Sequence, residues 1–424
     1  MIFIYRLLFP LAFLFFLPGL VIKLIRRPGR KSNYAERFGI FGRDRSEALS
    51  KMNGAVWIHA VSVGETNVAL SLLKKWTAAD PARKFVFSTT TTTAQEIAWN
   101  KVPAGVEVFF CPIDFTPYVK KVLKLIKPSA LVILETEIWP NLVTLARKSG
   151  VKVILVNGRI SDHSASGYRR FRMFFAPVLR QFHRICAQTA LDAERFAAIA
   201  SDLPVTVTGN IKFDQTPPSG LQGIGLAEFF GDQFTPVLAC STHAPEEKMM
   251  IEAFRDARKD HPELKLVIVP RHAERGNEIE NLLRNSGLSY YRRTSGKPLT
   301  GKVDCLLADT TGELLKFIHS AEIVLMGKTF CGNDEGQNII EPAALGKAIV
   351  TGPQMKNFKQ AFAALIKGNA VMKLETDAEL SGAIVKLTED PELRRELGAN
   401  AAKAIAAHAG ALNKTITILE ETIS

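Results

Sequence analysis

Residues 130–141 read ALVILETEIWPN, and this stretch decides the fold class. Its first five residues form a continuous apolar run, the pattern of a strand that is buried on both faces of a parallel sheet. Similar apolar runs, each followed by a segment with helical character, occur at residues 55–59, 84–88, 106–110, 151–156, 237–240, 265–269, 304–307, 323–326 and 348–350. This alternation predicts an α/β protein built on doubly wound parallel sheets.

A segment rich in Pro, Ser and Gly interrupts the alternation at residues 216–220 (TPPSG), and such a composition is typical of a linker. We therefore predict an N-terminal segment at 1–34, a Rossmann-like domain at 35–214 and a second Rossmann-like domain at 215–424. The sequence leaves open whether the last helices pack back on the first domain. Because ligands of such sheets bind beyond the carboxyl ends of the strands, we expect the site in a cleft between the two domains.

The charge balance favours anionic partners. The chain has 54 Lys and Arg against 42 Asp and Glu, a net charge of +12, which suits nucleic acid, anionic lipid or a phosphorylated substrate. Hydrophobic residues make up 47% of the chain, which excludes a mainly disordered protein. The five cysteines form no C-x-x-C and the histidines no H-E-x-x-H, so neither a disulfide framework nor a metal site is indicated.

The N-terminus has the pattern of a membrane-associated segment. Residues 7–22 (LLFPLAFLFFLPGLVI) carry no charge, and five Lys or Arg residues follow at 23–31. The run is borderline for a spanning helix, which needs about 20 apolar residues. A short signal-anchor and a monotopic interfacial segment both fit, and a buried helix of a soluble domain is the alternative. By the positive-inside rule, the basic cluster keeps the rest of the chain in the cytoplasm.

Acidic residues follow two of the predicted strands in the first half of the chain. Glu65 closes the sequence SVGE at the start of a predicted helix, where it either stabilises the helix N-terminus or acts as a general base. Contact with the helix dipole is expected to lower its pKa. Glu135 and Glu137 follow the strand at 130–134, and in an extended chain they would face the same side. Their position at a strand end indicates a function.

Phosphate-binding patterns follow strands in the second half of the chain. Pro270, Arg271 and His272 follow the run at 265–269, and the Arg271 guanidinium is a fork-shaped partner for phosphate. Residues 309–314 (DTTGEL) form a turn into a helix, which predicts either an anion site or an ordinary N-cap. Residues 327–341 form a glycine-rich loop that runs into a helix, but they lack the P-loop pattern GxxxxGK[ST].

Residues 168–184 (YRRFRMFFAPVLRQFHR) show apolar residues at helical spacing, with arginines on the opposite face. The pattern predicts one helix, which either faces the core or meets anionic lipid. Basic and aromatic residues together also fit nucleic acid, but no recognised nucleic-acid module accompanies them.

An ordered set of motifs resembles the Kdo transferases, the 3-deoxy-D-manno-octulosonic acid transferases of lipopolysaccharide synthesis. The set covers nearly the whole chain and comprises AERFG, HAVSVGET, ETEIWPN, NGRIS, TGNIKFD, STHAPEE, PRH, TTGELL and NIIEPAALGKAIVTGP. The resemblance implies a GT-B glycosyltransferase fold with a cleft between two domains. It implies transfer of Kdo from CMP-Kdo to a lipid A precursor, with inversion and with neither a cofactor nor a metal.

The resemblance also implies partners and a location. The partners are CMP-Kdo, the lipid A precursor and a membrane surface, but not nucleic acid, and the location is the inner membrane with the catalytic domains facing the cytoplasm. The alternatives are another membrane-bound GT-B enzyme, a UDP-sugar transferase or epimerase, and a non-catalytic basic protein that binds anionic lipid or nucleic acid.

Residue by residue, the resemblance makes Glu65 the catalytic base and Glu135 and Lys212 groups that stabilise the transition state. One base on the acceptor side suits an inverting transfer, and the leaving phosphate needs positive charge. The positions that match CMP-binding residues are Pro270, Arg271, Gly312, Glu313, Leu314, Asn338, Ile339, Ile340 and Glu341. The chain departs from the family pattern at Lys328 and Glu335, which change the charge beside the expected nucleotide.

Overall fold

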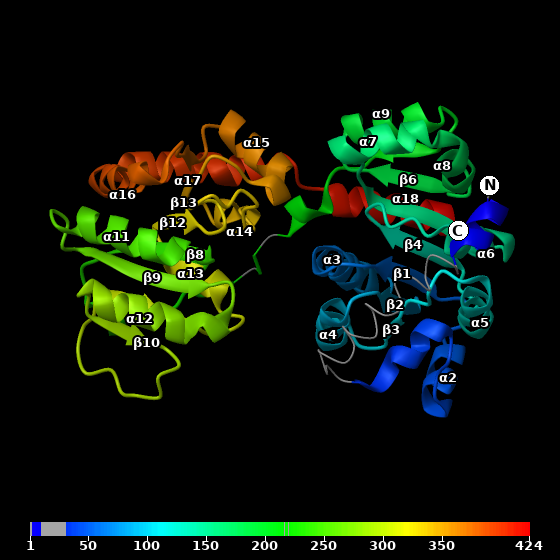
Figure 1. Cartoon of the computed structure of the whole chain (residues 1–424), viewed down its shortest axis with the longest axis horizontal. Helices are drawn as coiled ribbons and strands as arrows, with labels where there is room; N and C mark the ends of the chain where they lie inside the picture. The colour runs from blue at the N-terminus through cyan, green and yellow to red at the C-terminus, as the bar shows by residue number, and fades with distance from the viewer. Residues whose placement is uncertain (1, 10–30, 216, 219) are drawn as a thin grey trace. The chain divides into compact units, whose positions relative to one another are not determined.

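The computed structural model describes residues 2–9, 31–215, 217–218 and 220–424 (Figure 1). These residues form two compact units: unit 1 holds the described residues up to Asp214 together with Gly410–Ser424, and unit 2 holds those from Gln215 to Ala409. The last helix of the domain predicted at 215–424 therefore belongs to unit 1. Its start is held there by Asp214, whose carboxylate accepts hydrogen bonds from the N–H groups of Gly410 at 2.6 Å and Leu412 at 2.8 Å.

Unit 1 is a parallel sheet of seven strands in the order β3-β2-β1-β4-β5-β6-β7. Helices cover both faces, so the central strands are buried on both sides, as their apolar runs predicted. The strands are β1 (Val56–Ala60), β2 (Phe85–Thr89), β3 (Glu107–Phe110), β4 (Ala130–Leu134), β5 (Lys152–Gly158), β6 (Arg184–Ala187) and β7 (Val205–Val207). The helices are η1 (Lys31–Phe38), α2 (Arg43–Ser50), α3 (Val63–Ala79), α4 (Thr92–Lys101), α5 (Thr116–Ile126), α6 (Pro140–Lys148), α7 (Asp162–Arg170), α8 (Arg172–Leu179), α9 (Ala190–Ile199), η2 (Ile211–Asp214) and α18 (Ala411–Ile423).

Unit 2 repeats this architecture with the strand order β10-β11-β9-β8-β12-β13-β14, again all parallel. The strands are β8 (Thr235–Thr242), β9 (Leu264–Pro270), β10 (Tyr290–Arg292), β11 (Cys305–Leu307), β12 (Ile323–Met326), β13 (Ala348–Thr351) and β14 (Met372–Lys373). The helices are α10 (Ala227–Phe230), α11 (Glu246–Arg258), η3 (Ala273–Arg275), α12 (Gly276–Ser286), α13 (Leu314–Ser320), α14 (Ile340–Ala344), η4 (Lys356–Phe358), α15 (Lys359–Lys367), η5 (Asp377–Glu379), α16 (Leu380–Glu389) and α17 (Pro391–Ala406).

Each sheet has a point where the strand order reverses. In unit 1 it lies between β1 and β4, because the chain adds β2 and β3 on one side of β1 and then returns to add β4 on the other. In unit 2 it lies between β8 and β12. Ligands of doubly wound sheets bind beyond the carboxyl ends of the strands at such points. Ligands are therefore expected at the segments that leave β1, β4, β8 and β12.

The prediction of one continuous helix over residues 168–184 was wrong. The chain leaves helical geometry at Phe171, which separates α7 from α8, and Arg184 already begins β6. Pro177 lies inside α8 and cannot donate the helical hydrogen bond to Met173, which weakens the first turn. Tyr168 and Phe175 pack against the core of unit 1, so the apolar stripe largely faces the core, while Phe171 and Met173 are 58% and 74% exposed.

Most of the predicted membrane segment lies outside the described residues. Residues 2–9 are helical, and Phe3, Ile4, Leu7 and Leu8 are more than half exposed. Among the helices of the described ranges, none is both long and apolar enough to cross a membrane.

Candidate functional site

The predicted site residues fall into two groups, one in each unit. Glu65 belongs to the first turn of α3, directly after β1, and Ser62 is the N-cap. The Glu65 N–H donates to Ser62 Oγ at 3.3 Å, while the Glu65 carboxylate accepts from the Ser62 hydroxyl at 2.6 Å and from the Val61 N–H at 2.7 Å. This reciprocal pattern is a capping box, and it fixes the Glu65 carboxylate at the carboxyl end of β1.

Burial dominates the electrostatics of Glu65. The side chain is 5% exposed, and its burial raises its pKa, as does the charge of Glu135, while the hydrogen bonds from Ser62 and Val61 oppose the rise. The prediction that the helix dipole lowers this pKa was therefore wrong, because loss of hydration outweighs the favourable contacts at the helix start. A raised pKa brings the carboxylate closer to the operating pH, which favours general-base catalysis.

Glu135 and Lys212 form an ion pair at the same sheet edge. Glu135 follows β4 in a left-handed conformation, with φ of 54°, and its N–H donates to the carbonyl of Val156 in β5 at 2.8 Å. Its carboxylate lies 3.4 Å from Lys212 Nζ, and both side chains are about one fifth exposed. Lys212 is positioned by η2, which is anchored by a 3.0 Å bond from the Ile211 N–H to Asn157 Oδ1.

Glu137 is a third acid in this group, and no separate role was predicted for it from the sequence. Residues 135–137 are not extended, because the Ile138 N–H donates to the Thr136 carbonyl at 2.9 Å and closes a tight turn. The expectation that Glu135 and Glu137 share one face of an extended segment was therefore wrong. Burial first, and then the charges of Glu65 and Glu135, raise the pKa of Glu137 to about 7. Three carboxyl groups thus interact at the β1–β4 edge, with Lys212 as the neighbouring cation.

We expect Glu137→Gln to change how stability depends on pH. In the folded protein, Glu137 keeps its proton up to a pKa of about 7, whereas in the unfolded chain it ionises near 4.5. The unfolded state binds fewer protons between these values, so wild-type stability falls as the pH rises through this window. The free energy of unfolding of the variant, relative to wild type, should therefore rise by about 1–3 kcal/mol from acidic to neutral pH. Urea denaturation at several pH values measures this, and a difference that is constant with pH would contradict it.

In unit 2, Glu246 organises the glycine-rich loop that follows β12. Glu246 is fully buried at the start of α11, and its carboxylate accepts four backbone N–H bonds, from His243 at 3.1 Å, Lys328 at 2.8 Å, and Thr329 and Phe330 at 2.9 Å. It therefore joins the ends of β8 and β12. The motif STHAPEE contains this residue, but nothing in its spacing distinguishes Glu246 from an ordinary acid at a helix start.

We expect Glu246→Ala to lower the stability of unit 2 by about 3–5 kcal/mol, because it removes the acceptor of four N–H groups, those of Thr329 and Phe330 being buried. Denaturation followed by circular dichroism measures the change. Glu252→Ala is the matched control on the same helix, because Glu252 is exposed and its ion pair with Lys248 is long, at 4.0 Å. This variant should change stability by less than about 0.5 kcal/mol. Equal losses for the two variants would contradict this role of Glu246.

The predicted CMP-binding positions lie at the carboxyl edge of the unit 2 sheet. Pro270 ends β9 and is buried, and Arg271 follows it with an exposed side chain. The Arg271 N–H donates to the Thr242 carbonyl at 3.0 Å, which holds the backbone beside the end of β8. Gly327 is required here for a steric reason, because a Cβ atom on it would lie 2.3 Å from the Ser241 carbonyl oxygen.

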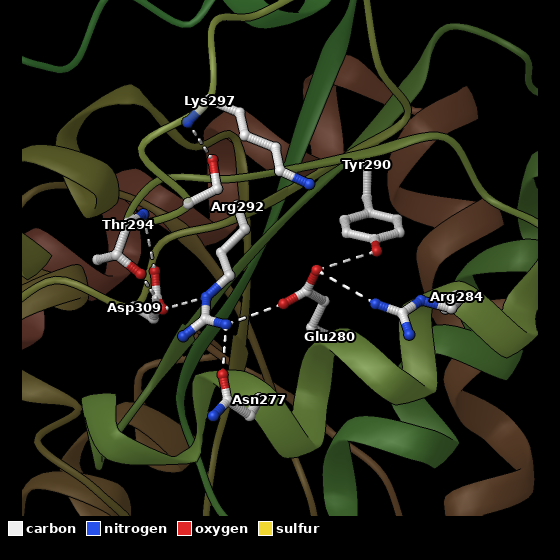
Figure 2. Close-up of polar contacts among 9 residues, drawn as sticks. Asn277, Glu280, Arg284, Tyr290, Arg292, Thr294, Lys297 and Asp309 are labelled. Carbon is white, nitrogen blue, oxygen red and sulfur yellow. Dashed lines mark hydrogen bonds and ion pairs between the residues drawn. The ribbon is translucent and has the colours of Figure 1, made fainter.

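Two arginines at the end of β10 hold the DTTGEL turn. Arg292 Nε donates to the buried Asp309 at 2.7 Å and Arg292 Nη1 to Glu280 at 2.8 Å, and Figure 2 shows Arg292 between these two carboxylates. Arg293 donates to both carboxylate oxygens of Glu313, at 2.8 and 3.0 Å. Because its carboxylate is paired, Glu313 can offer a nucleotide mainly its backbone, together with Gly312, whose φ is +89°, and Leu314 at the start of α13.

The last predicted donor segment is only partly accessible. Ile339 and Ile340 are buried, so their side chains belong to the core. Asn338 Oδ1 accepts a bond from the Ile340 N–H at 3.2 Å just before α14, in which Glu341 is partly buried. Lys328, at which the chain departs from the family pattern, forms an ion pair with Glu335, so the two added charges offset each other. Among the described residues, no group of His, Cys, Asp and Glu could hold a metal ion.

Known proteins are similar to both units. A family model for 3-deoxy-D-manno-octulosonic-acid transferase (kdotransferase) matches residues 32–215, and one for glycosyl transferases group 1 matches residues 246–404. The 3-deoxy-D-manno-octulosonic acid transferase of Bordetella pertussis is 31% identical over 391 residues, which cover 90% of each chain. That of Haemophilus influenzae is 27% identical over 400 residues, 93% of this chain and 92% of the relative.

Solved structures show the same architecture. A glycosyltransferase from Rickettsia africae superposes with a TM-score of 0.58 over 88% of this chain and 99% of its own, at 11% identity. With two Rossmann-like units, this likeness confirms the predicted GT-B fold. The family models and the similarity over most of the chain confirm that the protein is a glycosyltransferase, and it belongs to the Kdo transferase family.

Proposed function

We propose that this chain is an inverting glycosyltransferase that transfers Kdo from CMP-Kdo to a lipid A precursor in lipopolysaccharide core synthesis. The observation that carries the proposal is the arrangement at the β1–β4 edge, a buried carboxylate beside a Glu–Lys ion pair, in a member of the Kdo transferase family. We assign proton transfer to unit 1 and donor binding to unit 2.

Glu65 acts as the general base in this proposal. A carboxylate has about four acceptor positions, and Ser62 and Val61 use two of them, so Glu65 can still accept a bond from a substrate hydroxyl. Glu65 takes the proton of the attacking hydroxyl, while the oxygen of that hydroxyl bonds to the anomeric carbon of Kdo. The bond from that carbon to the CMP phosphate oxygen breaks on the opposite face, so the configuration inverts and CMP leaves with the bonding electrons.

Glu135 and Lys212 stabilise the charges that develop in this step. Positive charge builds up on the sugar ring as the bond to CMP breaks, and the negative charge of the fixed Glu135 carboxylate stabilises it. Negative charge builds up on the leaving phosphate, and the Lys212 ammonium favours that. The 3.4 Å ion pair holds the two groups in place before substrate arrives, so the reaction pays little for their reorientation.

Unit 2 supplies the donor contacts. Arg271 is exposed beside the ends of β8 and β9, where its guanidinium can bind the CMP phosphate through two parallel hydrogen bonds. The other proposed donor contacts come from backbone and from side chains. The backbone contacts are those of Pro270, Gly312, Glu313, Leu314, Ile339 and Ile340, and the side chains are those of Asn338 and Glu341. The bond to CMP already activates Kdo for transfer, because CMP is a good leaving group. We therefore propose no metal and no cofactor.

We also propose that the chain acts at the inner membrane, with both units on the cytoplasmic side. Residues 2–9 present exposed apolar side chains, and the ring of Tyr5 lies 6.1 Å from that of Phe174 in α8. The exposed Phe171, just before α8, and Met173 in α8 therefore belong to the same region, and Arg169, Arg170 and Arg172 beside them are exposed as well. Apolar side chains flanked by arginines suit an anionic lipid surface.

The purified full chain in detergent tests the proposed donor and acceptor. With CMP-Kdo, release of CMP should depend on added lipid A precursor, and UDP-sugars should give no release of UDP. Release of UDP with the same acceptor would favour a UDP-sugar transferase instead. Absence of turnover with both donors would contradict the proposal.

A further inference from the structure

The acidic loop that carries Glu135 and Glu137 is held at both ends by other segments. At its start, the Glu135 N–H donates to β5. At its end, the first turn of α6 has no side-chain cap of its own at Trp139, and it is capped instead by Asp114, which follows β3. The Asp114 carboxylate accepts bonds from the N–H groups of Asn141 at 2.9 Å and Leu142 at 2.7 Å. Asp114 therefore fixes the point where the acidic loop enters α6.

The N-terminal helix completes this anchor. The Tyr5 hydroxyl donates to Asp114 Oδ2 at 2.8 Å, and Arg6 Nε donates to Asn141 Oδ1 at 2.7 Å. Asn141 in turn donates to the Asp114 carbonyl at 2.7 Å. Asp114 is 2% exposed and Asn141 is 1% exposed, so both bonds from the N-terminal helix reach buried groups. A buried carboxylate that loses a donor loses much of its stabilisation.

Tyr5 is a dependable donor in this position. Burial and the charge of Asp114 raise its pKa, so its hydroxyl keeps its proton at any working pH. Burial raises the pKa of Asp114, and the hydrogen bond from Tyr5 and the positive charge of Arg6 both oppose this rise. Both N-terminal residues thus favour the ionised Asp114 that caps α6.

The same helix has two distinct faces. Phe3, Ile4, Leu7 and Leu8 lie on one side at helical spacing, and all four are exposed. Tyr5 and Arg6 lie on the other side, against unit 1, where the Tyr5 ring also packs 5.2 Å from that of Phe9. One face of the helix is therefore free to meet lipid while the other contacts the anchor of the acidic loop.

We propose that Tyr5 and Arg6 are positioning residues for glycosyl transfer: they link the membrane-facing N-terminal helix to Asp114 and Asn141, and thereby hold the loop that carries Glu135 and Glu137. The inference rests on the proposed function for its effect on the reaction, but the link itself can be measured without turnover. Through this link, a lipid surface that binds the exposed face of the helix also stabilises the acidic loop.

Tyr5→Phe in the full chain tests the link, because it removes one hydroxyl and leaves the ring packing. Hydrogen–deuterium exchange should become about tenfold faster at the amides of Asn141 and Leu142, while exchange in β4 and α3 stays as in wild type. Tyr291→Phe is the matched control, since it also removes one hydroxyl bond, a 2.9 Å contact with the Lys297 carbonyl in unit 2. Unchanged exchange at Asn141 and Leu142 in Tyr5→Phe would overturn the link.

Activity then tests the consequence. In detergent, Tyr5→Phe should lower kcat about tenfold with the KM for CMP-Kdo unchanged, and it should still bind vesicles of phosphatidylethanolamine and phosphatidylglycerol. Arg6→Met should have a similar effect and Arg6→Lys a smaller one, because Lys keeps a donor and the charge. Wild-type kcat in Tyr5→Phe and Arg6→Met would overturn the positioning role. If wild type itself transfers no Kdo, the proposed function fails, and the exchange result still decides the link.

Discussion

Replacing Glu65 by Gln is expected to lower kcat by roughly 10²- to 10⁴-fold, the usual contribution of a general base. Gln has nearly the same shape as Glu and also serves in a capping box, so α3 should keep its start. The amide, however, cannot take the proton from the attacking hydroxyl. Rates of CMP release under saturating CMP-Kdo and lipid A precursor measure the effect.

Two controls separate this loss from damage to the fold. Binding of CMP-Kdo to Glu65→Gln should survive, because the proposed donor contacts lie in unit 2. Glu47→Gln, which removes one charge from an exposed ion pair with Lys51 in α2, should leave the rate unchanged. Full activity of Glu65→Gln would reject Glu65 as the base.

Replacing Lys212 by Met is expected to lower kcat by roughly 10²- to 10³-fold, because a fixed charge that stabilises the transition state contributes about that much. Met has a similar length and keeps the packing of the stem, so η2 should remain in place. The expected loss is in kcat, with donor binding retained. Stopped assays of CMP release at saturating donor measure it.

The ion pair makes this prediction sharper. If Lys212 and Glu135 work as one unit, the double variant Lys212→Met/Glu135→Gln should lose far less than the product of the two single losses. A wild-type rate in Lys212→Met, or single losses that simply multiply, would contradict the assigned roles.

The fold was largely predictable because the central strands are buried on both faces. The runs at 130–134 and 323–326 coincide with β4 and β12, and the other predicted runs match strands within one or two residues at each end. β6 was missed because its start overlaps the helix predicted over 168–184, although three of its four residues are buried. The short strands β7, β10 and β14 were missed as well. They are two or three residues long and are partly or fully exposed, so they carry no continuous apolar run.

The site was predictable only where chemistry and local spacing coincide. Glu65 belongs to a Ser-x-x-Glu helix start, which the sequence displays, but its burial is invisible there and the direction of its pKa shift was predicted wrongly. The pairing of Glu135 with Lys212 depends on η2 and on the bond to Asn157, which no spacing reveals; the family resemblance gave both residues a role but did not predict that they pair. Glu246 was missed because its four partners come from backbone that is distant in the sequence or belongs to the turn before α11.

The most direct test of the central claim is mass spectrometry of the glycolipid formed when the purified chain is incubated with CMP-Kdo and a lipid A precursor. The account predicts that wild type adds Kdo to the precursor and that Glu65→Gln, with donor binding intact, leaves it unmodified. A precursor that wild type leaves unmodified, or a Glu65→Gln product identical to that of wild type, would contradict it.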